Sequence, residues 1–398
     1  MAIEDLPYTV TWNPTAPAWV PSQFTATGAD GGAAHLTLID QRKLPHDLEY
    51  LDCFTAKQVC DAIADLAVRG APALGVSGAF AVVLWAKNEW PIEWAQKDAA
   101  TKKVMLEREA FIPALKKVVK KVANVRPTAV NLSWGAKQML EFAQAGFAAN
   151  ATMPQIVEAI EHRAIEIAEE DKQMSIAIGE NGARLLAELS KRKGRKLRVE
   201  THCNAGSLAT VHRGTATAVI YKAFEEGLIE KVWVDETRPV DQGARLTAWE
   251  MGRAGVPYTL ICDDMAGALM KKGEVDAVIV GADRICANGD VANKIGTYQL
   301  AVLARFHDVP FFVAAPRTTF DYSLALGDQI EIEERDPREV RGILSRGSWV
   351  DVAPRNADVF NPAFDVTPHE LITKIITEAA SEDEGTAAAD ESGLAETA

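Results

Sequence analysis

Short runs of β-branched and other apolar residues recur through the second half of the chain, and stretches with helical periodicity separate them. In residues 242–253 and 295–306, apolar side chains repeat every three to four positions, which favours amphipathic helices. Alternating strands and helices imply right-handed crossovers and a parallel sheet covered by helices. The pattern predicts a Rossmann-like sheet with strands at 197–203, 231–235, 256–262, 275–282 and 309–315.

The preceding part of the chain is mostly helical by the same criterion. In residues 56–68, Val59 and Ile63 fall on one face of a predicted helix. Pro154 is suited to the first turn of a long helix, which is expected to end near Ser190. The fold class expected is therefore α/β, with a mostly helical N-terminal domain and a small β-sheet before the C-terminal Rossmann-like domain.

Composition marks further segments at both ends and in the middle of the chain. Residues 1–37 are rich in Pro, Thr, Gly and Ala and show only short alternating strands, and the basic run 191–196 is typical of a solvated linker. Residues 381–398 are acidic and Ala-rich, a composition typical of disorder. The expected segments are an extension at 1–37, a helical domain at 38–190, the Rossmann-like domain at 191–380 and a tail at 381–398.

Charge and cysteine content narrow the class of protein. The net charge is −14, but six acidic residues in the tail leave −8 for the rest, which argues against broad nucleic-acid binding. The longest apolar run, 71–86, is too short to span a membrane, and the first residues lack the features of a signal peptide. Five cysteines without zinc-ligand spacing suit a reducing cytosol, so a cytoplasmic protein is expected.

The carboxyl ends of the five predicted strands carry polar residues. Ligands of open parallel sheets bind at this edge, so we expect a site there, although Asp and Asn also cap turns into helices. Residues 204–210 do not form a G-x-G-x-x-G motif and the chain has no P-loop, so no nucleotide cofactor is expected. The strand-end residues are Cys203, Asn204, Asp235, Asp263, Asp283, Pro316 and Arg317.

Cys203 and Asp283 are the two candidates for chemistry. If a helix begins near Ser207, its free N–H groups and dipole face the Cys203 thiol and favour the thiolate. The same N–H groups suit a phosphate. Asp283 follows an apolar strand, where desolvation can prepare its carboxyl as a general acid. A packed cysteine and a helix-capping carboxylate are the alternatives that these residues leave open.

Three short segments combine positive charge with a probable helix start, as an anion site requires. Each taken alone is more often a cap or a solvated charge. His202 adjoins Cys203, but successive strand residues point to opposite faces, so a buried, hydrogen-bonded histidine is expected instead of a Cys–His pair. The three segments are Arg69-Gly70-Ala71-Pro72, residues 126–131 beginning with Arg126, and Asn293-Lys294.

Nine motifs, among them H-C-N-A-G at 202–206 and G-A-D-R at 281–284, carry a resemblance to a known family. The chain resembles the methylthioribose-1-phosphate isomerases, which share a fold with regulatory subunits of translation initiation factor 2B. The similarity runs from about Leu38 to Glu378, and the extension and tail depart from it. The other motifs lie at 40–45, 68–73, 126–131, 235–239, 242–250, 288–297 and 361–368.

The resemblance implies roles for individual residues. Cys203 is one reacting residue, and Asp283 is the proton donor. No metal or cofactor is implied, and a homodimer is expected. The positions that the family implies for substrate contacts are Arg69, Gly70, Ala71, Arg126, Gln242, Asn293 and Lys294.

The implied reaction is the aldose–ketose isomerisation of 5-methylthioribose 1-phosphate to 5-methylthioribulose 1-phosphate in methionine salvage. Whether hydrogen moves as a proton or as a hydride stays open. Two rival functions stay open as well. One is an isomerase of ribose 1,5-bisphosphate, which would need a second cationic anchor for the 5-phosphate, and the other is a non-catalytic subunit of the initiation factor 2B type.

Overall fold

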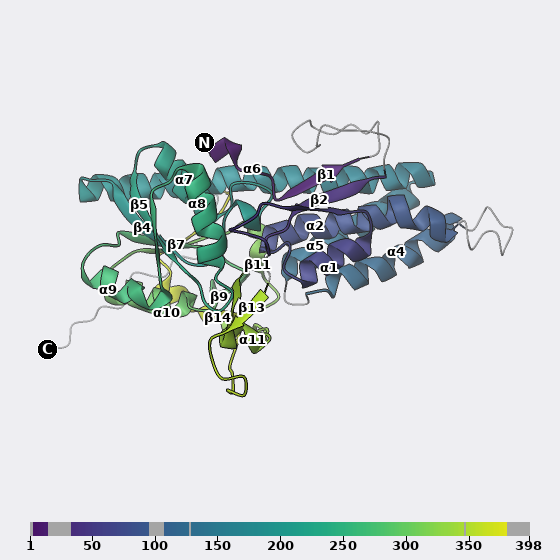
Figure 1. Ribbon diagram of the computed structural model, residues 1–398. Helices are drawn as coiled ribbons and strands as arrows, with labels where there is room; N and C mark the ends of the chain where they lie inside the picture. Colours follow the sequence, from purple (N-terminus) through teal and green to yellow (C-terminus); the bar gives the residue numbers. More distant parts are fainter. Residues whose placement is uncertain (1–2, 15–32, 95–106, 127–128, 346–347, 380–398) are drawn as a thin grey trace.

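The computed structural model describes residues 3–14, 33–94, 107–126, 129–345 and 348–379. It has a helical N-terminal half and a C-terminal half built on a parallel sheet, side by side along one axis (Figure 1). The expected tail at 381–398 and most of the expected extension lie outside the described residues. No helix in the described part of the chain has both the length and the apolar character needed to cross a membrane.

The N-terminal half packs helices beneath a small antiparallel sheet of order β1-β2-β3. Its centre is α2 (Ala71–Leu84), which is apolar on every side and almost wholly buried. Glycines let helices approach closely here, because a Cβ on Gly135 would overlap the backbone of Gly75. The elements are β1 (Val10–Asn13), β2 (His35–Ile39), β3 (Tyr50–Cys53), α1 (Ala56–Ala64), α4 (Glu107–Ala123) and α5 (Val130–Ala148).

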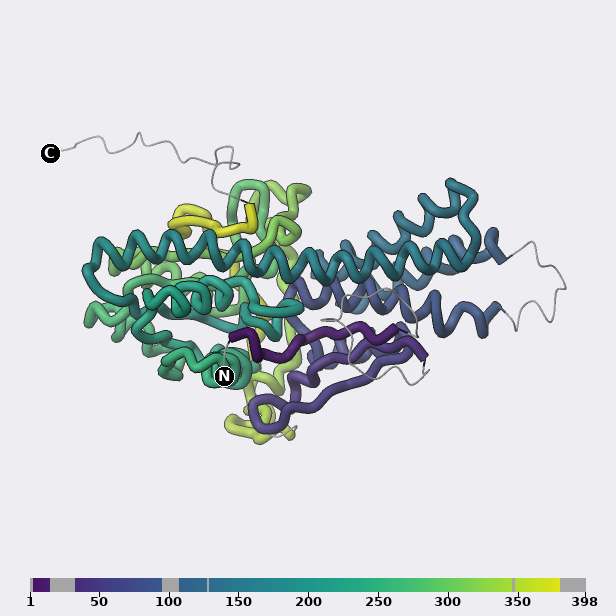
Figure 2. The backbone as a smooth tube through the Cα atoms, turned by 90° about the horizontal axis from the view of Figure 1, so that it is seen from above, coloured from purple at the N-terminus to yellow at the C-terminus, as the bar shows by residue number. Residues whose placement is uncertain are grey.

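Helix α6 (Met153–Lys193) runs through both halves of the molecule (Figure 2). Its first part contributes Ile156 and Ile160 to the N-terminal core, and its second part contributes Ile178 and Leu186 to the C-terminal core. The long helix expected from Pro154 onward is confirmed. The expectation of a linker from residue 191 is wrong for 191–193, because these residues form the last helical turn, where basic side chains favourably face the helix dipole.

The C-terminal half contains a six-stranded, all-parallel sheet in the order β15-β10-β7-β4-β5-β6. The Rossmann-like sheet and its five predicted strands are confirmed, and β15 is a sixth strand too short to stand out in the sequence. Chain connections run outward from β4 in one direction and from β7 in the other. The strands are β4 (Leu197–Thr201), β5 (Ile229–Asp235), β6 (Tyr258–Ile261), β7 (Ala277–Val280), β10 (Phe311–Ala314) and β15 (Lys374–Ile376).

Helices α7 (Ala216–Glu225), α8 (Ala248–Ala254), α9 (Ala266–Lys271) and α10 (Thr297–Phe306) connect these strands. A second, four-stranded sheet of order β11-β8-β9-β14 follows β7 and was not predicted, because its strands have only two to four residues. The helix predicted over 295–306 begins two residues later than expected, at Thr297. The remaining elements are β8 (Arg284–Cys286), β9 (Val291–Lys294), β11 (Phe320–Asp321), α11 (Arg338–Arg341), β12 (Gly342–Ser345), β13 (Ser348–Asp351) and β14 (Phe364–Thr367).

Candidate active site

Cys203 and Asp283 follow two neighbouring strands at the centre of the sheet. Cys203 lies two residues after β4, and Asp283 lies three residues after β7. The strand order reverses between β4 and β7, and ligands of doubly wound sheets bind outside the carboxyl ends of the strands at such a point. The position of the two residues is therefore that of a ligand site in this fold.

A small cavity of about 30 Å³ joins this sheet edge to the N-terminal half. Both candidate reacting residues line it, together with the start of α2. Typical ligand sites occupy roughly 300 Å³ or more, so this space is smaller than a typical ligand site. The lining residues used below are Arg69, Gly70, Ala71, Cys203, Asp283 and Asn293.

The backbone of Cys203 is held in an uncommon conformation. Its φ is 64°, in the left-handed region that costs a residue other than glycine about 1–3 kcal/mol. Its N–H donates to Thr237 Oγ1 at 2.8 Å, and its carbonyl accepts from Thr247 Oγ1 at 2.6 Å. Two hydroxyl groups from the following segments of the sheet therefore fix the direction of the thiol.

No α-helix begins near Ser207, so the condition under which a helix dipole would face the Cys203 thiol is not met. Residues Ser207–Ala209 form one 3-10 turn, and the next α-helix begins only at Ala216. The N–H groups of Ser207 and Leu208 donate to the carboxylate of Glu250, which leaves neither of them for a thiolate or a phosphate. Sequence reasoning missed Glu250 because a single carboxylate within a helical pattern looks like a solvated side chain.

The resting protonation of Cys203 also differs from the expectation. Burial raises the pKa of the Cys203 thiol, while the nearby cations of Arg69 and Lys294 oppose this shift and the charge of Asp283 adds to it. Burial likewise raises the pKa of Asp283, with Lys294 and Arg69 opposing. Burial therefore shifts both groups toward their protonated forms, which suits a proton donor at Asp283 and disfavours a resting thiolate at Cys203.

Arg69 reaches from the N-terminal half to the loop after β4. Its two terminal nitrogens donate to Asn204, one to Oδ1 at 2.6 Å and the other to the backbone oxygen at 2.7 Å. Gly70 follows with φ 93° and precedes α2, whose N-terminus has no side-chain cap, and a Cβ on Gly70 would overlap Ala209. A guanidinium and uncapped N–H groups, including that of Ala71, are the features of an anion site.

Asn293 and Lys294 belong to β9, and of the two only Asn293 lines the cavity. The Lys294 ammonium donates to Ala363 O at 2.7 Å and lies 4.6 Å from the centre of the Phe364 ring. Burial lowers the pKa of Lys294, and the charges of Cys203 and Asp283 oppose this shift. The charge of Lys294 therefore shifts the pKa values of both Cys203 and Asp283, and the charges of these two groups shift the pKa of Lys294.

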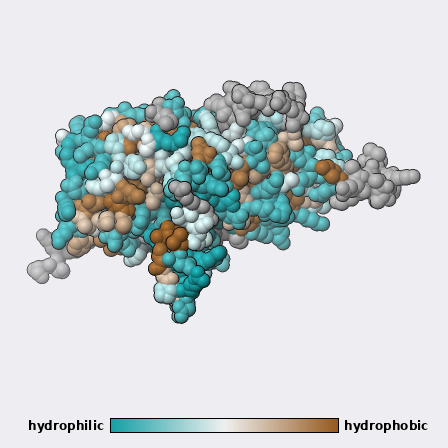
Figure 3. All heavy atoms as spheres, viewed as in Figure 1, coloured by the Kyte–Doolittle hydropathy of each residue, from teal (hydrophilic) through white to brown (hydrophobic). Residues whose placement is uncertain are grey.

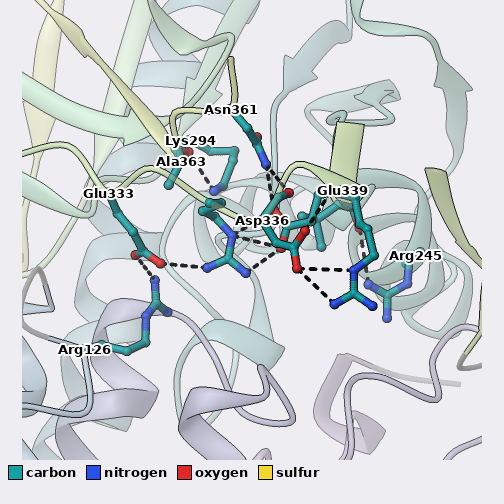
Figure 4. Close-up of polar contacts among 11 residues, drawn as sticks. Arg126, Arg245, Lys294, Glu333, Asp336, Glu339, Asn361 and Ala363 are labelled. Carbon is teal, nitrogen blue, oxygen red and sulfur yellow. Dashed lines mark hydrogen bonds and ion pairs between the residues drawn. The ribbon is translucent and has the colours of Figure 1, made fainter. Parts of the chain in front are cut away.

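Arg126 extends from the N-terminal half toward Glu333, which precedes α11 (Figure 4). The two groups form an ion pair of 3.1 Å, and Glu333 also contacts Arg335 at 2.8 Å. Arg126 acts on the Asp283 carboxyl through its charge but does not line the cavity. Gln242 also lies outside the cavity lining; it is buried, and its Oε1 has no hydrogen-bond partner within the described residues.

Three of the remaining polar positions near strand ends make contacts within the protein. His202 is buried, as expected, and its ring nitrogens contact Asp235 at 2.9 Å and Ile295 O at 2.8 Å. Burial lowers the pKa of His202, but the contact with Asp235 and other neighbouring groups raise it overall. Asp263 accepts from the N–H groups of Thr237 and Arg238. His202, Asp235 and Asp263 lie close enough to hold a metal ion, but both ring nitrogens of His202 are already engaged by Asp235 and Ile295 O.

Comparison with known proteins places the chain in a broad family. Residues 67–380 match the Initiation factor 2 subunit family, and the chain belongs to it. A crystal structure of 5-methylthioribose 1-phosphate isomerase from Pyrococcus horikoshii OT3 has the same fold. The TM-score is 0.77 at 38% identity, and the match covers 94% of this chain and 92% of that one.

Sequence relatives define the family more narrowly. Methylthioribose-1-phosphate isomerase 1 of Pseudothermotoga lettingae is 50% identical over 343 residues, which is 86% of this chain and 91% of the relative. 5-Deoxyribose 1-phosphate isomerase of Moorella thermoacetica is 48% identical over 341 residues, 86% of this chain and 90% of that protein. The chain belongs to the methylthioribose-1-phosphate isomerase family, as its motifs predicted.

Proposed function

We propose that this chain isomerises 5-methylthioribose 1-phosphate to 5-methylthioribulose 1-phosphate in methionine salvage. The observation that carries the proposal is the pairing of a buried thiol and a carboxyl at one cavity, on adjacent strands, within a chain 50% identical to an isomerase of that name. A non-catalytic subunit would have no need of this pair. Arg69, the start of α2 and Lys294 supply positive charge for a phosphate.

In the proposed mechanism, Asp283 donates a proton to the ring oxygen, because the phosphate on the anomeric oxygen prevents a free aldehyde from forming. Hydrogen then moves from C2 to C1. In the proton route the Cys203 thiolate removes it from C2 as a proton, an enolate-like intermediate forms, and the thiol returns a proton to C1. In the hydride route Cys203 only stabilises charge. Arg69 and Lys294 hold the negative phosphate of the substrate in either case, and burial of the reacting residues limits the entry of water.

Isotopic labelling at C2 distinguishes the two routes. We expect deuterium from C2-labelled substrate to be lost largely to solvent, because the Cys203 thiol exchanges its proton with water. The measurement is the deuterium content at C1 of the product by NMR. Retention at C1 would instead favour hydride transfer, and complete loss of the label to solvent would exclude it.

A substrate panel tests the function itself. Purified protein is assayed with 5-methylthioribose 1-phosphate, 5-deoxyribose 1-phosphate and ribose 1,5-bisphosphate. The second compound is the alternative substrate suggested by the name of the Moorella relative. We expect turnover of the first two, which carry uncharged groups at C5, and none of the bisphosphate. Turnover of the bisphosphate alone would overturn the proposed substrate, and inactivity with all three would favour a regulatory subunit.

We also propose that the protein is cytoplasmic and that it forms a homodimer. All five cysteines are free, as a reducing compartment requires.

Figure 3 shows apolar surface on the C-terminal half near the positions of α9 and α10 in Figure 1. On α10, the side chains of Tyr298, Val302 and Phe306 are spaced four residues apart and are exposed by 45%, 41% and 79%. A stripe of this kind suits the self-complementary contact of a two-fold dimer.

Phe306→Glu should convert the homodimer into a monomer, because it puts a charge on the most exposed side chain of that stripe, at its C-terminal end. Sedimentation velocity measures the change. The matched control is Phe360→Glu, which alters an equally exposed phenylalanine, 81% exposed, away from α10. A dimer that survives Phe306→Glu but dissociates with Phe360→Glu would assign the contact to the other surface.

A further inference from the structure

Glu250, on α8, is a completely buried carboxylate that does not line the cavity. It accepts four hydrogen bonds. Oε1 accepts from the Asn204 side-chain amide at 2.9 Å and from Leu208 N at 3.0 Å. Oε2 accepts from Ser207 N at 2.8 Å and from the Tyr221 hydroxyl at 3.0 Å. Three of the four donors therefore belong to the loop that follows Cys203.

This arrangement of donors suits an ionised carboxylate. Burial raises the pKa of Glu250, and the four hydrogen bonds oppose that shift. Three of the four partners are N–H groups that can only donate, and the Tyr221 hydroxyl alone could accept from a protonated carboxyl. The loop is shaped around the charge, since a Cβ on Gly206 would overlap the Glu250 carboxylate. A buried charge held in this way fixes its partners firmly.

The chain of contacts continues from the loop to Arg69. The Asn204 side chain donates from Nδ2 to Glu250 Oε1 and to Thr247 Oγ1, and it accepts from Arg69 through Oδ1. One turn before Glu250, the Thr247 hydroxyl donates to the Cys203 carbonyl. One helical segment therefore holds both the reacting thiol and the cation that arrives from the N-terminal half.

We propose that Glu250 is a positioning residue that orients the Arg69 guanidinium, through Asn204, for the phosphate of the substrate. This inference rests on the proposed function in one respect: it takes the bound phosphate to be part of a sugar-phosphate substrate. Arg69 alone could rotate among many conformers. Fixing both of its terminal nitrogens on Asn204 presents the rest of the guanidinium to the cavity at low entropic cost.

The test compares Glu250→Gln with Tyr221→Phe. The glutamine keeps the size of the side chain but replaces one acceptor oxygen by a donor, which conflicts with a donor of the loop. Tyr221→Phe removes the one donor that lies outside the loop, so it weakens the same buried carboxylate without disturbing Asn204. We expect Glu250→Gln to raise KM for the sugar phosphate about tenfold, with a smaller effect on kcat. Tyr221→Phe should leave KM unchanged.

Inorganic phosphate gives a second readout that needs no turnover. Its dissociation constant, measured by calorimetry, should rise in parallel with KM for Glu250→Gln and stay constant for Tyr221→Phe. The phosphate measurement remains informative even if the chain isomerises no sugar. A failure of the proposed function can therefore be distinguished from a failure of the proposed role of Glu250. Unchanged phosphate affinity in a folded Glu250→Gln variant, with only a lower melting temperature, would make Glu250 purely structural and overturn the proposal.

A double-mutant cycle with Asn204→Ala covers the case in which Glu250→Gln folds poorly. Asn204→Ala removes the side-chain link to Arg69 but keeps the contact with the backbone oxygen of residue 204, and it leaves Glu250 with two backbone donors and the Tyr221 hydroxyl. If Glu250 acts through Asn204, adding Glu250→Gln to Asn204→Ala should weaken phosphate binding no further. Additive losses would show that Glu250 acts by another path and would also contradict the proposal, as would an Asn204→Ala variant with the parent's affinity.

Discussion

Cys203→Ser should lower kcat/KM for 5-methylthioribose 1-phosphate by about 10³-fold, the typical contribution of a positioned acid–base group. Serine is close to cysteine in size, but its hydroxyl ionises far less readily than a thiol. The contacts that hold the backbone at φ 64° come from Thr237 and Thr247 and do not involve the Cys203 side chain. The fold should therefore survive, which thermal denaturation beside the steady-state kinetics would check.

Cys262→Ser is the matched control for this experiment. Cys262 follows β6 as Cys203 follows β4, but it lies outside the cavity. Its replacement should leave both kcat and KM near the parental values. A folded Cys203→Ser variant within tenfold of the parent would exclude Cys203 as the group that moves or stabilises the reacting hydrogen.

The central sheet could be predicted from sequence because each strand is a buried apolar run, and such runs differ clearly from the helices between them. The same logic made Cys203 and Asp283 candidates, because strand ends at the centre of a parallel sheet converge. It did not distinguish them from Asp235 and Asp263, which also end strands but hydrogen-bond to His202 and to backbone N–H groups. Only the positions of those partners in space separate the two cases.

The missed features depend on contacts between distant segments. The loop after Cys203 folds around Glu250, more than forty positions away, and this contact replaced the helix expected near Ser207. The short strand β9, which carries Lys294, pairs with β14 about seventy positions later. Periodicities of two or 3.6 residues describe one segment at a time and hold no information about pairings between distant segments. Local secondary-structure propensity was therefore a weak guide to the structure near Ser207 and in β9.

Asp283→Asn should also lower kcat by about 10³-fold, because an amide cannot donate a proton to the ring oxygen at any accessible pH. Its shape is nearly that of the carboxyl, so substrate binding should change far less. Asp321→Asn is the matched control: Asp321 is 3.6 Å from Arg284, the residue next to Asp283, and removing its charge tests general electrostatic effects near the site. A folded Asp283→Asn variant with a kcat close to the parent's would remove Asp283 from the mechanism.

The pH dependence of the residual activity in Asp283→Asn carries the sharper information. The proton route needs Cys203 ionised and Asp283 protonated, although burial raises the pKa of both. With the thiol pKa above that of the carboxyl, the fraction of enzyme in this state rises with pH up to the carboxyl pKa. It stays level between the two pKa values and falls above the thiol pKa.

In Asp283→Asn, position 283 is permanently neutral, so only the ionisation of Cys203 should limit the rate. The rising limb of kcat against pH should then move upward, from the pKa of the carboxyl to that of the thiol, and the falling limb should disappear. Residual activity that is independent of pH would mean that no ionised thiol is needed. In that case hydrogen moves as a hydride, and Cys203 acts by its position and polarity alone.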